Sequence, residues 1–236
     1  MISTLPLSFA DPREAADLGA FLTRLLRFDR AAAVRLQAVP TSGAVGEETA
    51  GGGVLAVYGR LPLGGTGVLA LRTARLAGQA PAADSTVSAG QLLEGVDEAA
   101  GTLAVPPPVT GPAWAGMLPP RAGWQLLGTT ETNLVMPQLI DSVREFKERT
   151  AQVPEHHRTR AVLDGLADEI WARPLEVLPA LPLRAAHAAY RIGFLSPDAP
   201  LTAHRAGGWQ RLSAPHGTVV LRTATPGAGL GLTPLG

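Results

Sequence analysis

The sequence predicts an α+β protein built from two related units, each combining helices with a three-stranded antiparallel sheet. The segment "GVLALRT" (67–73) is nearly repeated as "GTVVLRT" (217–223). Both segments end a stretch in which a helical pattern is followed by three strand-like patterns. We therefore expect an internal duplication, with the first unit at 1–78, a connector at 79–123 and the second unit at 124–236.

The first unit is expected to open with a helix that begins near Asp11. Asp11 is a suitable N-cap, Pro12 suits the first helical position, and Glu14 stands where a capping box places its acidic residue. Apolar residues then recur at helical spacing and give the helix one apolar face. They are Leu18, Phe21, Leu22, Leu25 and Leu26.

Three strands are expected to follow this helix. The stretch 31–39 alternates between apolar and polar residues and ends at Pro40. The stretches 53–61 and 66–74 form a predicted hairpin joined by "PLGG". The first unit is thus a helix followed by three strands.

The connector at 79–123 differs in composition from both flanking units. It contains seven prolines, and residues 81–120 carry four carboxylates with no lysine or arginine. Loops of this length are uncommon in compact domains. We expect an extended, acidic connector with one short helix starting near Ser88, held in place by Trp114 and Trp124.

The second unit is expected to contain three helices, at about 136–150, from Pro154 to before Pro174, and after Pro182. Strand-like runs at 201–206, 209–215 and 218–223 follow, with a two-glycine turn between the first two. The helical patterns predict these inward-facing residues: Leu139, Ile140, Val143 and Phe146 in the first helix, Val162, Leu163, Leu166 and Ile170 in the second, and Leu183, Ala186, Tyr190 and Phe194 in or after the third.

Helices followed by a β-hairpin also resemble a winged helix-turn-helix, in which the last helix enters the major groove of DNA. Arg184, His187 and Arg191 are spaced three and four apart and share one side of the third helix. Arg205 and Arg211 lie in the hairpin that follows, and residues 176–224 carry a net charge of +3. These five residues are the candidate binding residues. The zero net charge of the whole chain opposes nucleic-acid binding.

Signals for catalysis or metal binding are weak. His156 and His157 are adjacent, so on a helix they point about 100° apart and do not ligate one ion. His187 has no identifiable nucleophile or substrate partner for a general base. Neither a G-x-S-x-G nor a P-loop motif is present, and there is no cysteine. We expect no metal, no cofactor and no catalytic residues.

Composition is that of a globular protein, with 236 residues of which 46% are apolar. The start of the chain lacks the pattern of a secretory signal, and no run of about 18 apolar residues indicates a transmembrane helix. A cytoplasmic location without membrane association is the expectation.

Two segments resemble a known family. "LPPRAGW" (118–124) and "LPLRAAHAAYRIGFL" (181–195) are similar to segments of full-length proteins of actinobacteria and similar GC-rich bacteria. No activity is assigned to that family. The resemblance implies a bacterial cytoplasmic protein and transfers no catalytic residue.

Three functions remain open. The leading hypothesis is a non-catalytic binding or regulatory module that forms a homodimer and recognises a protein or small molecule in the cleft between the halves. The second is a DNA-binding regulator that uses the C-terminal unit. The third is a hydrolase that uses His187 or His157.

Overall fold

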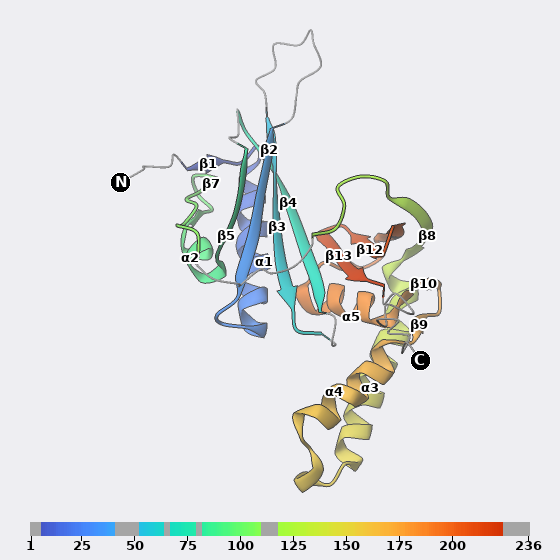
Figure 1. The fold of residues 1–236 in the computed structure, drawn as a ribbon. Coiled ribbons are helices and arrows are strands. Elements are labelled where there is room, and N and C mark those ends of the chain that lie inside the picture. The colour runs from blue at the N-terminus through green and yellow to red at the C-terminus, as the bar shows by residue number, and fades with distance from the viewer. Residues whose placement is uncertain (1–5, 41–51, 64–66, 79–81, 110–117, 224–236) are drawn as a thin grey trace, which may run out of the picture.

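An eight-stranded antiparallel sheet forms the centre of the computed structural model, which describes residues 6–40, 52–63, 67–78, 82–109 and 118–223. The N-terminal unit supplies one half of the sheet and the C-terminal unit the other (Figure 1). In spatial order the strands are β5 (Ala83–Ser88), β2 (Ala33–Pro40), β3 (Gly53–Leu61), β4 (Val68–Leu76), β13 (Gly217–Arg222), β12 (Trp209–Ala214), β11 (Pro200–Ala206) and β8 (Gln125–Glu131).

Helix α1 (Pro12–Phe28) covers the N-terminal half of the sheet. The Asp11 side chain accepts a hydrogen bond from the Arg13 amide, which confirms the predicted N-cap. The carboxylate of Glu14 contacts Arg72 of β4. The expected apolar face is confirmed, because Leu18, Leu22 and Leu25 are fully buried.

The N-terminal unit continues beyond β4. After β5 come α2 (Ala89–Glu94) and a small three-stranded sheet of β1 (Leu7–Ser8), β7 (Thr102–Leu103) and β6 (Val96–Asp97). The prediction of an extended connector is therefore wrong over residues 83–103, which form strands and a helix that pack on the first unit. The short helix expected near Ser88 is present, and the Ser88 hydroxyl caps it. Trp114 lies outside the described residues.

The C-terminal unit places helices between its first strand and its last three. These are α3 (Thr132–Gln152), the 3₁₀ turn η1 (Glu155–His157), α4 (Arg160–Trp171) and α5 (Leu183–Ile192), with the short hairpin β9 (Pro174–Leu175) and β10 (Leu178–Pro182) before α5. Helix α5 packs on the sheet, on the same face as α1. The rings of Phe21 and Phe194 stack at 5.7 Å between the two units. The hairpin of α3 and α4 extends away from the sheet (Figure 1).

The α+β class and the two helix-plus-three-strand units are confirmed, as α1-β2-β3-β4 and α5-β11-β12-β13. The structure does not confirm the predicted resemblance to a winged helix. Strands β11 to β13 continue the central sheet instead of forming a separate wing, and most of α5 is buried against that sheet. A helix buried in this way has no free face wide enough to enter a DNA groove.

The two near-identical segments lie side by side as β4 and β13. They pair antiparallel, with Ala70 opposite Val219 and Leu71 opposite Thr218. Directly paired residues point to the same face of a sheet. Ala70 therefore shares the helix-covered face with Val219, although the sequence match aligns it with Val220. The sequence alignment and the sheet faces thus differ by one residue. Residues that match in the two segments therefore point to opposite faces of the sheet.

The helical patterns predicted most inward-facing residues correctly but failed at three positions. Ile140 is 55% exposed and Tyr190 is 49% exposed, and Val162 on α4 is also exposed. Leu139, Ile170, Leu183 and Phe194 are buried as expected. Among the described residues, no helix is long and apolar enough to cross a membrane.

Candidate functional site

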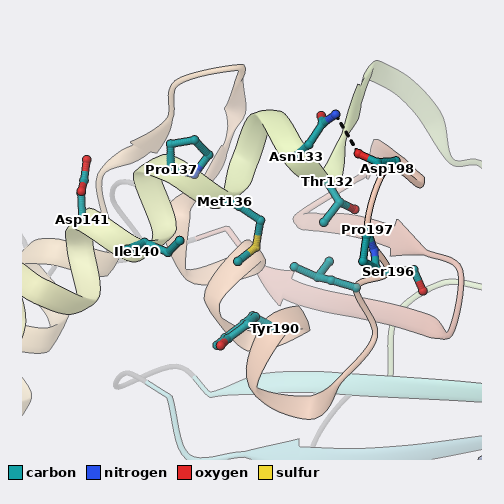
Figure 2. A pocket seen from close by; sticks show the side chains of 11 residues that line it. Thr132, Asn133, Met136, Pro137, Ile140, Asp141, Tyr190, Ser196, Pro197 and Asp198 are labelled. Carbon is teal, nitrogen blue, oxygen red and sulfur yellow. Dashed lines mark hydrogen bonds between the residues drawn. The ribbon is translucent and has the colours of Figure 1, made fainter.

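A wide groove lies between the first half of α3 and the chain that follows α5 (Figure 2). Its volume is about 620 Å³, within the range of about 300–1,000 Å³ that is usual for binding sites. Eleven residues line it: Thr132, Asn133, Met136, Pro137, Ile140, Asp141, Tyr190, Leu195, Ser196, Pro197 and Asp198. All of them belong to the C-terminal unit.

The α3 wall is apolar because of how this helix divides its residues. Val135 and Leu139 point into the core and are fully buried. Met136 and Ile140, each one position further on, point into the groove (Figure 2). Pro137 has no amide hydrogen, so the carbonyl of Asn133 lacks its usual helical donor.

The opposite wall is formed by Tyr190 of α5 and by residues 195–198. Gly193 ends α5 in the left-handed conformation, with φ of 76°. Asp198 also has a positive φ, 55°. Its carboxylate accepts a hydrogen bond from the side-chain amide of Asn133 at 3.0 Å. Thr132 donates from its backbone amide and its hydroxyl to the carbonyl of Ala199. These bonds fix the wall against the start of α3.

The charges at the groove are acidic. Asp198 lies at one end, and Asp141 lies at the other, where it pairs with Arg144 at 2.7 Å. No arginine, lysine or histidine is among the lining residues that the structure describes. The groove therefore suits an apolar occupant with hydrogen-bond donors at its end.

The predicted residues of α5 lie outside this groove and have different surroundings. The guanidinium of Arg184 is mostly buried and pairs with Asp168 of α4 at 2.5 Å. His187 is 7% exposed, and its ring stacks on Trp171 at 3.9 Å. Burial, with a smaller contribution from Arg191 and then Arg184, lowers the pKa of His187 to about 4. A neutral, packed histidine beside a paired arginine is part of the core between α4 and α5.

The other three predicted residues lie apart from one another. Arg191 is exposed, with its guanidinium 5.5 Å from the centre of the Phe28 ring. Arg205 is exposed on β11. Arg211 lies on β12, where it lines a second cavity between the two units. The five residues thus do not form one site, although Arg191 and Arg211 each lie where the two units meet.

The adjacent histidines form no metal site. His156 and His157 are exposed in η1, with ring centres 4.1 Å apart and tilted. Within the described parts of the chain, no three histidine, aspartate or glutamate side chains gather as metal ligands.

One polar pair was not predicted from the sequence. The hydroxyl of Ser196 lies 2.8 Å from Nε2 of His216. The backbone amide of His216 also donates to the carbonyl of Phe194. The two residues are 20 positions apart and belong to no familiar motif, so only the packing of the turn before β13 against the chain after α5 reveals them.

The fold and the groove define a two-unit α+β protein with an open apolar groove. Residues 2–116 match the family model Domain of unknown function (DUF8010), and residues 119–226 match Domain of unknown function (DUF8185). The first match includes β5 and α2, in agreement with their packing on the N-terminal unit. The searches of curated proteins and of solved structures gave no match.

Proposed function

We propose that this protein is a non-catalytic binding protein that holds an apolar helical segment of a partner protein in the groove between α3 and α5. The observation that carries the proposal is the exposure of large apolar side chains on both walls. Ile140 and Tyr190 are each about half exposed, although they line one groove. Clustered apolar side chains of this kind are typical of recognition surfaces.

The shape of the groove favours a helix over a small molecule. Its α3 wall extends over about two helical turns, from Asn133 to Asp141. An amphipathic helix inserts side chains at positions i, i+3 or i+4, and i+7 into a groove of this length. A small apolar ligand would instead be enclosed by its site, whereas these walls remain open to solvent. The carbonyl of Asn133, which lacks the amide donor of residue 137, and the carboxylate of Asp198 would accept hydrogen bonds from donors at one end of the helix.

The test is a selection of 16-residue peptides from a random phage-displayed library on the wild-type protein. Enriched peptides should carry apolar residues at helical spacing. Their affinity should fall roughly tenfold or more in Ile140→Glu, because a carboxylate would then face the buried apolar side chains of the peptide. Titration by fluorescence anisotropy measures this loss.

Leu134→Glu is the matched control, because Leu134 is on the same helix and 56% exposed but does not line the groove. Peptide binding should be unchanged in this variant. Peptides that bind equally well to Ile140→Glu would overturn the proposal. A dimer that Ile140→Glu converts to a monomer, measured by light scattering, would show that a second copy of the chain is the occupant and would also overturn it.

A bacterial origin and a cytoplasmic location are also proposed from the sequence, as is a homodimer that joins through a surface other than this groove. The structure adds no support to the residues on which the two alternative functions rested. DNA binding relied on Arg184, His187 and Arg191, two of which are packed between α4 and α5. The hydrolase relied on His187 or His157, and neither lines the groove.

A further inference from the structure

A second cavity lies on the face of the sheet opposite the helices, where the two units join. Its volume is about 260 Å³, smaller than the groove. Strands β2, β3 and β4 line it from the N-terminal unit, and β12 and β13 line it from the C-terminal unit. Residues 118–124 cross the sheet and complete the cavity through Pro119, Pro120, Arg121 and Trp124.

The cavity combines an apolar floor with cationic and hydrogen-bonding groups. Ala56, Leu71 and Val220 contribute apolar side chains. Arg121 and Arg211 contribute guanidinium groups, and Tyr58 contributes its phenol. Burial raises the pKa of Tyr58, with a partial opposing effect of Arg121, so the phenol remains a proton donor at neutral pH.

Arg211 is a partly buried cation without an anionic partner among the described residues. Its guanidinium lies 4.4 Å from the centre of the Trp124 ring, which holds it in place. Its Nε is buried and has no hydrogen-bond acceptor. Buried charges in proteins are normally paired, because an unpaired charge loses its hydration without compensation.

The neighbouring groups do not neutralise Arg211. His204 lies directly opposite on β11, and burial together with Arg211 lowers the pKa of this imidazole. Asp84, across the sheet on β5, pairs with Arg35 at 2.6 Å and accepts a hydrogen bond from Gln37. An anion inside the cavity would meet Arg211 without displacing an existing partner, and Arg121 interacts electrostatically with Asp84 without an ion pair among the described residues.

We propose that this cavity binds a small organic carboxylate, with its carboxylate at Arg211 and Arg121 and its apolar body on Ala56, Leu71 and Val220. A planar carboxylate matches the two-pronged geometry of a guanidinium. The apolar floor favours a carboxylate with a hydrocarbon body over a bare inorganic anion. This site is independent of the α3–α5 groove, and it requires no partner protein.

The experiment compares benzoate, benzyl alcohol and inorganic phosphate on the full chain by isothermal calorimetry and thermal shift. Benzoate should bind with a Kd on the order of 1 mM and raise the melting temperature. Benzyl alcohol lacks the charge and phosphate lacks the apolar body, so both should bind at least roughly tenfold more weakly. Equal binding of either one would overturn the proposal.

Arg211→Gln and Arg121→Gln should each weaken benzoate binding by roughly tenfold. Arg121 is exposed, so its variant keeps the fold even where Arg211→Gln disturbs the Trp124 contact. Arg222→Gln is the matched control, because Arg222 also stacks on a tryptophan, Trp209, without lining the cavity. A loss of binding in Arg222→Gln equal to that in Arg211→Gln, or no loss in either cavity variant, would place the ligand elsewhere.

Discussion

The N-terminal and C-terminal units share a core but differ in what is added to it. Both pack one helix on three antiparallel strands, and each has a fourth strand at the outer edge of the sheet. In the N-terminal unit this strand, β5, follows the core in the chain, whereas in the C-terminal unit β8 precedes it. The outer strands are thus supplied from opposite ends of the two repeats.

The helices that follow these outer strands also differ in how far their apolar residues are buried. After β5, helix α2 packs on α1, and Ala89 and Leu92 are fully buried. After β8, the hairpin of α3 and α4 extends from the sheet and leaves Leu134, Ile140 and Val162 exposed. The shared core therefore builds the sheet, and the α3 wall of the proposed recognition surface lies in the addition that only the C-terminal unit has.

Arg72 and Arg222 show that the two units also differ at a single matching position. They occupy matching positions in the two similar sequence segments, but they point to opposite faces of the sheet. Arg72 lies under α1 and contacts Asp17 at 2.6 Å, Glu14 at 3.4 Å and the carbonyl of His216 at 2.7 Å. Arg222 is exposed and only stacks on Trp209.

The largest expected effect follows from this difference. Arg72→Ala should lower the free energy of unfolding by about 3 kcal/mol, because it leaves the largely buried Glu14 carboxylate and the His216 carbonyl without their donor. Asp17 is half exposed and contributes less. Arg222→Ala should cost only about 0.5–1 kcal/mol. Urea denaturation measures both values.

Similar losses in the two variants would contradict the assignment of opposite faces. They would show instead that the two segments are equivalent in structure as well as in sequence. Retention of the urea m-value in both variants is the control that unfolding remains a single cooperative step.

The second prediction concerns His187, a buried titratable group of the C-terminal unit. Its pKa of about 4 lies below the unfolded value of 6.5, so the unfolded chain binds a proton first as the pH falls. The stability that depends on neutral His187 is complete above pH 6.5 and is lost progressively down to about pH 4. The loss should reach about 2 kcal/mol at pH 5.

Urea denaturation at pH 7 and pH 5 checks this prediction by comparing wild type with His187→Phe, which preserves an aromatic ring against Trp171. The variant should lose about 2 kcal/mol less than wild type between the two pH values. His156→Gln, at an exposed position, should behave as wild type does. Equal pH dependence in His187→Phe and wild type would show that His187 is not the group responsible.

The sequence predicted the helices and strands of this fold better than it predicted which face of each strand points to the helices. A cap and apolar spacing identified α1, and Pro182 and apolar spacing identified α5, because local chemistry determines where these helices begin and which side they bury. The similar segments predicted two related units. They did not predict the phase of β4 against β13, since both faces of these strands carry apolar residues and the pattern fits either phase.

The groove was not predicted, for a related reason. Ile140 and Tyr190 occupy positions in helical patterns that normally indicate burial, and the sequence does not show that the covering element is missing. The Arg211 cavity depended on residues 118–124 crossing the sheet, a contact between segments far apart in the chain. Only Arg211 among its charged residues was a candidate from the sequence.

The smallest expected effect concerns Ser196 and His216, where a binding protein and a hydrolase make opposite predictions. A serine is activated when a histidine accepts its proton and a carboxylate orients that histidine. No carboxylate hydrogen bonds to His216 within the described residues, and its main chain is bonded to Phe194 instead. We therefore expect the pair to hold the wall of the groove in place.

A fluorophosphonate probe should accordingly leave Ser196 unlabelled, and Ser196→Ala should reduce the free energy of unfolding by only about 1 kcal/mol, the usual contribution of one hydrogen bond. Intact-protein mass spectrometry measures the labelling. Stoichiometric modification that disappears in both Ser196→Ala and His216→Ala would identify a nucleophile and overturn the non-catalytic proposal. Loss of stability without labelling would agree with a pair that joins the turn before β13 to the loop after α5.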